Sequence, residues 1–258
     1  MVVLKERIHK KALDEGFQLF GVSNIKKMEE VDVLPGRGLM RPSEVMPDAR
    51  SLFVLGMVIM DEGMNVSISN AGVSSVGNAK CHSLYYEVTE ARAWRISSWL
   101  KDMGYDAVPS HDVHIKVAAH LAGLGFIGHN TQVITPEYGP RVRWISVLTN
   151  AELEPDEPFN RDLCAEQPLC QKRSRCVISC PYQAIIPGPS QGVLPGQKVI
   201  YDKCVVAHKF DEDLDDKWEK HIRRISRHGF MSCTICNLTC PYGKSIDKNI
   251  APENREPV

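Results

Sequence analysis

Two cysteine-rich segments decide the fold of the C-terminal part of the chain: CAEQPLCQKRSRCVISCPY (Cys164–Tyr182) and CTICNLTCPY (Cys233–Tyr242). With Cys204 between them, they hold all but one of the 9 cysteines, and both end in C-x3-C-P-Y. The bacterial ferredoxin motif ends in C-x3-C-P, and its thiolates bind a [4Fe–4S] cluster. Two such groups of four thiolates predict two [4Fe–4S] clusters.

The ferredoxin motif also predicts how the ligands are divided, because its last cysteine binds the other cluster. The first cluster then takes Cys164, Cys170, Cys176 and Cys240, and the second takes Cys180, Cys204, Cys233 and Cys236. The first two gaps, Cys164 to Cys170 and Cys170 to Cys176, are longer than in the standard motif. Longer loops still reach a cluster, because the entropy of loop closure grows slowly with length.

Structural zinc is the main alternative, since two sites of four thiolates would also use eight cysteines. Zinc sites usually present pairs of C-x2-C, whereas C-x3-C-P occurs twice here. Disulfides are not expected, because the first residues, MVVLKERIHKKALDEGF, read as a charged amphipathic helix and not as a secretory signal.

Composition excludes some classes of function. Of the 258 residues 43% are hydrophobic and 24% charged, which is ordinary for a globular protein. The net charge of −1 gives no basic field for nucleic-acid binding. The longest apolar run, Leu52–Met60, is too short to span a membrane. Clusters and thiolates need a reducing compartment, so a cytoplasmic protein is expected.

Hydrophobic periodicity predicts a mixed α/β (α+β) fold. Helices are predicted at residues 2–16 and 83–103, strands at Phe17–Val22 and Ser51–Met60, and a loop or lid at Asn65–Asn78. An acidic, proline-bearing linker at Thr149–Pro158 is the expected domain boundary. The predicted divisions are an α/β domain at 1–152, a cluster domain at 153–248 and a tail at 249–258.

Gly123, Gly125 and Gly128 form the pattern G-x-G-x-x-G. In the dinucleotide-binding fingerprint this pattern follows a strand and opens a helix. Here a helix is predicted before the glycines and a strand after them, so dinucleotide binding is not expected. A tight turn is the simplest alternative.

The stretches MPDARSLFVLGMVI (46–59), AGLGFIGHN (122–130) and ITPEYGPRVRWISVLTN (134–150), followed by the two C-x3-C-P motifs, resemble the epoxyqueuosine reductase family. The reductive dehalogenases are more distant members with the same layout. The resemblance implies a nitroreductase-like α/β domain that binds base-off cobalamin. It also implies a ferredoxin-like domain whose two [4Fe–4S] clusters pass electrons to the cobalt.

The resemblance also implies site residues. The catalytic acid of the family lies just before the helix that enters the glycine turn, where Asp112 is the nearest match. The proton-donor candidates are Asp112, His114, Lys116 and Tyr86, with His111 and Tyr85 beside them. The expected cobalamin wall consists of Gly123, Gly125, Asn130, Thr131, Tyr138, Gly139 and Arg141. The ninth cysteine, Cys81, is expected to be a small buried side chain, with a redox or cobalt-ligand role as the alternative.

The resulting expectation is an iron–sulfur oxidoreductase that passes electrons to cobalamin for reductive chemistry on a small molecule. A low-potential ferredoxin or flavodoxin is the expected donor. A tRNA substrate is not expected, because the family's C-terminal helical-repeat region is absent from this sequence and the net charge is near zero. The alternatives are a non-catalytic two-cluster electron carrier and a corrinoid-handling protein. The oligomeric state is left open, with a homodimer as one alternative.

Overall fold

The apolar run that begins at Ser51 forms the strand β2 (Ser51–Val58), in which every residue except Val58 is buried. It pairs with β1 (Leu19–Ser23) on one side and with β6 (Val142–Thr149) on the other. β3 (Ala107–Ser110) pairs with the far side of β6, which gives the order β1-β2-β6-β3 with antiparallel pairing throughout. The predicted mixed class of helices and sheet is confirmed.

The structure is a computed structural model that describes residues 2–32, 39–59, 75–188, 198–200, 203–204, 223–226, 229–231 and 235–243. Side chains are not described at 2, 75–85, 223–226 and 229–231. The chain divides into two units: unit 1 comprises Met1–Val58, Glu87–Phe126 and Val142–Arg161, and unit 2 comprises Ile59–Tyr86, Ile127–Arg141 and Asp162–Val258. The predicted boundary at residue 152 stays a prediction, and the predicted tail lies outside the described residues.

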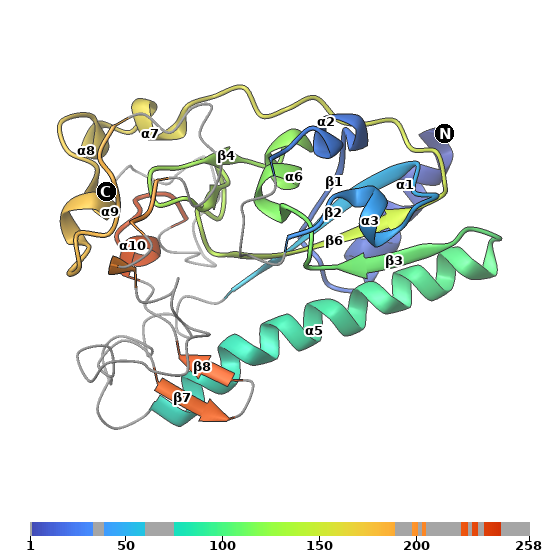
Figure 1. The fold of residues 1–258 in the computed structure, drawn as a ribbon, viewed down its shortest axis with the longest axis horizontal. Helices are drawn as coiled ribbons and strands as arrows, with labels where there is room; N and C mark the ends of the chain where they lie inside the picture. The colour runs from blue at the N-terminus through green and yellow to red at the C-terminus, as the bar shows by residue number, and fades with distance from the viewer. Residues whose placement is uncertain are drawn as a thin grey trace. The chain divides into compact units, whose positions relative to one another are not determined.

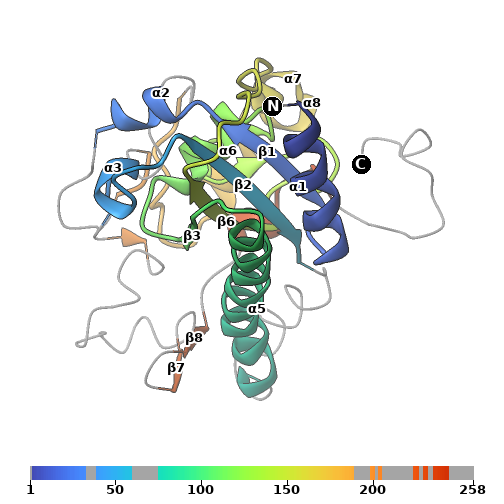
Figure 2. The same ribbon diagram turned by 90° about the vertical axis from the view of Figure 1, so that its right-hand side faces the viewer.

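Helices cover both faces of the sheet in unit 1, as its buried strands require. Figure 2 shows α6 (Ile115–Leu121) on one face, and α1 (Val2–Asp14) with the C-terminal part of α5 (Ser75–Asp102) on the other. The guanidinium of Arg7 lies 5.5 Å from the ring centroid of Trp99, which joins α1 to α5. Two short helices, α2 (Ile25–Glu29) and α3 (Pro42–Val45), pack against each other.

The helices predicted at residues 2–16 and 83–103 are confirmed, but α5 begins earlier, at Ser75. Residues 75–78, predicted as the end of a loop, are therefore helical. The remainder of that predicted loop, residues 65–74, lies outside the described residues. No helix among the described residues has the length and apolar character needed to cross a membrane.

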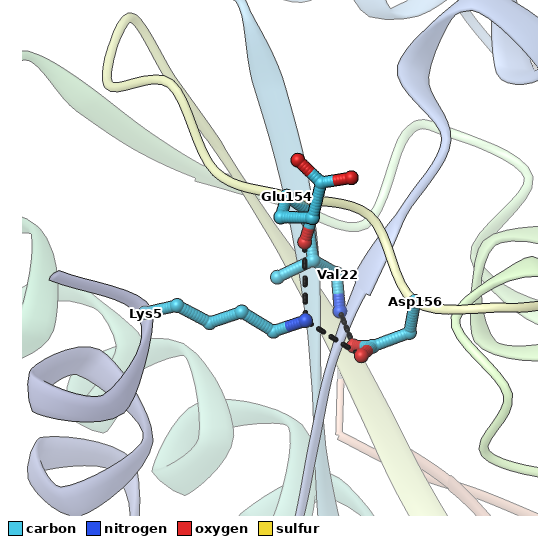
Figure 3. A network of polar contacts seen from close by, with 4 residues as sticks. All are labelled: Lys5, Val22, Glu154 and Asp156. Atoms are coloured by element: carbon cyan, nitrogen blue, oxygen red, sulfur yellow. Dashed lines mark hydrogen bonds and ion pairs between the residues drawn. The ribbon is translucent and has the colours of Figure 1, made fainter. Parts of the chain in front are cut away.

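The acidic stretch that follows β6, residues 150–161, lies along unit 1 and is here called the strap. The backbone N–H of Asp156 donates to the carbonyl of Val22 (2.8 Å), and its carboxylate accepts from the Val22 N–H (2.8 Å). Lys5 donates to the Asp156 carboxylate (2.6 Å) and to the carbonyl of Glu154 (3.0 Å), as Figure 3 shows. The N–H of Phe159 donates to the carbonyl of His120 (3.0 Å). The acidic composition that predicted a linker thus supplies the carboxylate that holds the strap in place.

Replacing Asp156 with alanine is expected to lower the free energy of unfolding of unit 1 by about 1–2 kcal/mol, because two charge-assisted hydrogen bonds are lost at a partly exposed site. Chemical denaturation measures this change, and hydrogen exchange should show faster exchange of the Val22 N–H. Glu154→Gln is the matched control, since Glu154 accepts from Lys5 through its backbone carbonyl. Equal stability of the two variants would contradict the assignment.

Unit 2 is built from short elements. Its helices are α7 (Leu163–Glu166), α8 (Pro168–Gln171), α9 (Arg175–Ser179) and α10 (Ile235–Leu238), seen in Figure 1. A small antiparallel sheet pairs β7 (Arg223–Ser226) with β8 (Gly229–Met231). A second two-stranded sheet pairs β4 (Phe126–Ile127) with β5 (Val133–Ile134). An isolated antiparallel bridge joins Ile185 to Val199.

Candidate metal centre and cofactor site

Three short helices position the first three cysteines: Cys164 lies in α7, Cys170 in α8 and Cys176 in α9. Two of these helices begin at side-chain caps. The carboxylate of Asp162 accepts from the N–H of Ala165 (2.9 Å), and the amide oxygen of Gln167 accepts from the N–H of Leu169 (3.4 Å). Such caps satisfy backbone donors that a four-residue helix cannot pair internally.

The thiols of these three cysteines gather with that of Cys240. Burial raises the pKa of the Cys164 thiol to about 12, and the neighbouring Cys240, Cys176 and Cys170 add to this rise. A hydrogen bond from the backbone N–H of His129 has the opposite effect and lowers this pKa. Burial likewise raises the pKa of Cys176 to about 12, again with Cys240 and Cys170 adding to the rise. Buried thiols that raise one another's pKa become thiolates when a metal binds them. The fourth member of this group, Cys240, comes from the second cysteine segment, and its role as a ligand of the first cluster stays a prediction.

Among the described residues, no group of three or more His, Cys, Asp or Glu side chains is arranged to hold a metal ion. The preference for [4Fe–4S] clusters over zinc therefore rests on the two C-x3-C-P motifs and not on the spacing of the thiols.

The cysteines in the described part of the chain take part in no disulfide: these are Cys164, Cys170, Cys176, Cys180, Cys204, Cys236 and Cys240. Cys233 and the side chain of Cys81 lie outside the described residues. The ligand set predicted for the second cluster therefore stays a prediction.

The two C-x3-C-P motifs meet at equivalent positions. The hydroxyl of Ser179, the residue before Cys180, lies 3.0 Å from the hydroxyl of Thr239, the residue before Cys240. Thr239 also donates to the carbonyl of Ile235 (3.0 Å), one turn earlier in α10. α9 and α10 lie side by side in unit 2 (Figure 1). This pairing brings the last cysteine of each motif toward the other motif.

Residues from the glycine-rich turn support the same centre. The amide of Asn130, which is 4% exposed, donates to the carbonyl of Cys236 (3.4 Å) and to the side-chain oxygen of Asn237 (3.3 Å). The imidazole Nδ1 of His129 is hydrogen-bonded to the hydroxyl of Ser174. Burial lowers the pKa of His129, while the charge of Asp162 opposes and that of Lys198 adds to the shift.

Two tyrosine–glycine pairs, Tyr138–Gly139 and Tyr242–Gly243, pack backbone against backbone. A Cβ on Gly139 (φ +55°) would overlap the carbonyl of Tyr242, and one on Gly243 (φ +68°) would overlap that of Tyr138. The guanidinium of Arg141, 2% exposed, donates to the same Tyr242 carbonyl (2.9 Å). Only glycine permits this approach, because it has no Cβ and tolerates positive φ.

Gly243→Ala is expected to lower the free energy of unfolding of unit 2 by more than about 3 kcal/mol, because the backbone of Tyr138 and Gly139 blocks the new methyl group. Gly104→Ala is the matched control. Gly104 also has positive φ (+88°), but its Cβ would meet no atom within 4 Å. The control should lose only the strain of about 1–2 kcal/mol that positive φ imposes. Chemical denaturation measures both, and equal losses would show that the close packing is unimportant.

Three of the proton-donor candidates, His111, Asp112 and His114, lie between β3 and α6 in unit 1. The Asp112 side chain is exposed, while its backbone N–H donates to the Ser110 hydroxyl (3.0 Å) and its carbonyl accepts from the Met40 N–H (2.7 Å). His114, 7% exposed, is the N-cap residue of α6. Burial lowers the pKa of His111, and the negative charges of Glu90 and Asp112 partly offset this by raising it. Asp112 therefore combines a fixed backbone with an accessible carboxylate.

The remaining proton-donor candidates are Lys116, Tyr86 and Tyr85. Lys116 lies in the first turn of α6 and is half-buried. Tyr86, in unit 2, is 40% exposed, and the side chain of Tyr85 lies outside the described residues.

The predicted cobalamin wall has two parts: Gly123 and Gly125 lie in unit 1, and the others in unit 2. A Cβ on Gly123 (φ +72°) would lie 2.7 Å from the carbonyl of Glu157 in the strap, so this glycine makes room for protein backbone. Thr131 has φ +58°, which is rare for a β-branched residue. Backbone strain of this kind is found at ligand sites, which makes Thr131 a candidate contact.

A shallow pocket of about 550 Å³ lies elsewhere in unit 1. Its lining comes from α2, the start of β2 and the strap: Ile25, Lys26, Glu29, Ala49, Arg50, Ser51, Glu152 and Leu153. None of the predicted catalytic or cofactor residues lines it.

Comparison with known proteins reveals relatives in two groups. The chain is 31% identical over 199 residues to a tetrachloroethene reductive dehalogenase of Desulfitobacterium hafniense, covering 74% of this chain and 33% of the relative. It is 29% identical over 153 residues to an epoxyqueuosine reductase of Lactococcus garvieae, covering 59% of this chain and 38% of the relative. This chain is a homologue of both groups. The predicted resemblance is thereby confirmed, although no family model matches the sequence.

Solved structures of both groups share the fold. The epoxyqueuosine reductase of Bacillus subtilis, solved with its catalytic aspartate loop swung out of the active site, superposes with a TM-score of 0.67 at 19% identity, covering 99% of this chain and 70% of that one. An epoxyqueuosine reductase with an epoxyqueuosine-modified tRNA stem loop gives 0.66 at 20% identity, over 98% and 70% of the chains. A reductive dehalogenase described for B12-dependent dehalogenation gives 0.64 at 18% identity, over 93% and 31%. The chain spans about a third of the length of the dehalogenases that it matches.

Several residues of this candidate centre have roles that the sequence alone did not predict. Sequence analysis assigned Asn130, Gly139 and Arg141 to the cobalamin wall, and it did not predict that they would contact the second cysteine segment. It gave no role to Ser179 and Thr239. The sequence does contain a pattern that marks Ser179 and Thr239, because a hydroxyl residue precedes the last cysteine of each C-x3-C-P motif.

Proposed function

We propose that the chain is the electron-relay and cobalamin-binding part of a reductase. The observation that supports this proposal best is the contact between the two C-x3-C-P motifs, in which Cys240 lies near Cys164 and Cys176. In this proposal Cys164, Cys170, Cys176 and Cys240 bind one [4Fe–4S] cluster, and Cys180, Cys204, Cys233 and Cys236 bind the other. The relatives named as reductases support an enzymatic role.

The cofactors supply electrons and the protein supplies position and protons. When bound, the clusters transfer single electrons and the cobalamin provides the reducing centre. Cobalamin binding is supported by the dehalogenase structure described as B12-dependent and by the strained backbone at Thr131. Asn130 and Arg141 would hold the second cysteine segment in place, because their polar groups bond to Cys236, Asn237 and Tyr242.

Asp112 is proposed as the proton donor. Reductive cleavage of a carbon–oxygen or carbon–halogen bond needs an acid at the leaving group. The Asp112 carboxylate is exposed on a turn, and a catalytic aspartate loop is named for the structural relative from Bacillus subtilis. The substrate class stays a prediction: a small molecule is proposed, while the epoxyqueuosine reductase with its tRNA stem loop keeps a tRNA substrate open.

Anaerobically purified and reconstituted protein tests the proposal in two steps. It should contain about eight irons per chain and show the reduced-cluster signals of [4Fe–4S] centres in electron paramagnetic resonance. Hydroxocobalamin should then bind with one-to-one stoichiometry, measured by the shift of its absorption spectrum. Stoichiometric zinc without iron would contradict the cluster proposal. Full iron without cobalamin binding would instead favour the two-cluster electron carrier.

A further inference from the structure

The loop between Cys170 and Cys176 carries the most concentrated positive charge of the first cysteine segment. Lys172, Arg173 and Arg175 are exposed, and none of their side chains makes a hydrogen bond or ion pair with any described residue. Glu and Asp are absent from residue 167 through residue 197. A local charge of +3 thus stands in a chain whose net charge is −1.

Exposed apolar side chains flank these cations. Leu169 is 40% exposed and Ile178 is 57% exposed. We call residues 169–178 the basic segment. A solvated charged loop has no need of exposed leucine and isoleucine at its ends, whereas protein-binding surfaces combine apolar contacts with charged residues at the rim.

The basic segment also contains two of the proposed ligands of the first cluster. Cys170 and Cys176 lie within it, and each is partly exposed. A partner that covers the segment would therefore approach the first cluster closely. Short distance is the main requirement of protein electron transfer, and electrostatic attraction raises the rate of encounter.

We propose that the basic segment is the docking surface for an acidic, low-potential electron-carrier protein. The inference rests on the proposed function, since it assumes a cluster bound at Cys170 and Cys176. In each productive encounter the reduced carrier loses one electron and the first cluster gains it, with no bond formed and no proton transferred. The cations of the segment steer the acidic carrier, and Leu169 and Ile178 provide the apolar contact.

The test uses the reconstituted full chain and an acidic flavodoxin, photochemically reduced, with cluster bleaching followed by stopped flow. The variant reverses three charges: Lys172→Glu, Arg173→Glu and Arg175→Glu. We expect the second-order rate constant to fall by about 10- to 100-fold at low ionic strength, because attraction becomes repulsion. The wild-type rate should fall as salt is added, and the rate of the variant should not.

A matched control keeps the total charge change equal. Lys10→Glu, Lys26→Glu and Lys27→Glu reverse three exposed cations of α1 and α2 in unit 1. This variant should react within about twofold of wild type, since these charges lie outside the basic segment and salt screens exposed charges. Reduced methyl viologen, a small cation, should reduce both variants at least as fast as it reduces the wild type. That result shows that the clusters are intact.

Two outcomes would overturn the docking surface. One is a wild-type flavodoxin rate in the basic-segment variant, and the other is an equal loss in the control. Binding of oxidised flavodoxin, measured by its flavin fluorescence, needs no cluster. A chain without iron that still binds flavodoxin through the basic segment would contradict the proposed function alone. If tRNA displaces bound flavodoxin while the three charge reversals leave flavodoxin binding unchanged, the basic segment is a nucleic-acid surface instead.

Discussion

Cys240→Ser is expected to remove or convert the cluster held by Cys164, Cys170 and Cys176, although Cys240 lies 64 positions beyond Cys176 in the sequence. The reason is the local packing of unit 2, in which the Cys240 thiol raises the pKa of both Cys164 and Cys176. Serine is a poor iron ligand, so about four of eight irons should be lost or one cluster should become a three-iron centre.

Electron paramagnetic resonance separates the two clusters. Cys240→Ser and Cys170→Ser should alter the same signal, and Cys180→Ser and Cys236→Ser should alter the other. Cys81→Ser is the control, because Cys81 lies outside both cysteine segments, and its iron content should equal that of wild type. A Cys240→Ser spectrum that matches the loss seen in Cys236→Ser would show that each segment binds its own cluster.

Asp112→Asn is expected to lower turnover by about 10²–10⁴-fold, the usual contribution of a general acid, without changing iron or cobalamin content. Asparagine has nearly the same shape but cannot give up a proton. The backbone of residue 112 should keep its position, because its N–H and carbonyl bond to Ser110 and Met40. Turnover is measured with two candidate substrates, an epoxyqueuosine-modified tRNA stem loop and a halogenated phenol.

Asp106→Asn is the matched control, since Asp106 is an exposed aspartate at the other end of the same strand, β3. Its turnover should equal that of wild type. Wild-type turnover in Asp112→Asn would move the role to His114, Lys116, Tyr86 or His111. His111 is the less suitable proton donor of these, because burial lowers its pKa and so reduces the share of the protonated imidazole that could give up a proton.

The sequence predicts most of unit 1, because its main elements carry strong local patterns. The continuous apolar run of β2 and the helical spacing of α1 and α5 are independent of what lies next to them. β3 was missed, since it has four residues and contains Pro109, which a strand accepts only at the edge of a sheet. β4 was missed because its two residues lie inside a glycine-rich turn.

The site is less predictable, because its contacts join residues far apart in the sequence. Motif spacing grouped Cys240 with the first segment, and this grouping stays a prediction, supported by the influence of the Cys240 thiol on the pKa of Cys164. No local pattern could show that Arg141 bonds to Tyr242, or that Gly139 makes room for Tyr242 and Gly243 for Tyr138. Each of these contacts joins residues about a hundred positions apart and depends on the tertiary packing of unit 2.

The strap has a consequence for how unit 1 can be isolated. β1 is an outer strand of the sheet, and Asp156 occupies both the N–H and the carbonyl of Val22. A fragment ending at residue 152 would keep all four strands but leave those groups open to the strand of another molecule. Open strand edges promote aggregation. A fragment that retains residues 153–161 should stay monomeric where the shorter one assembles through β1.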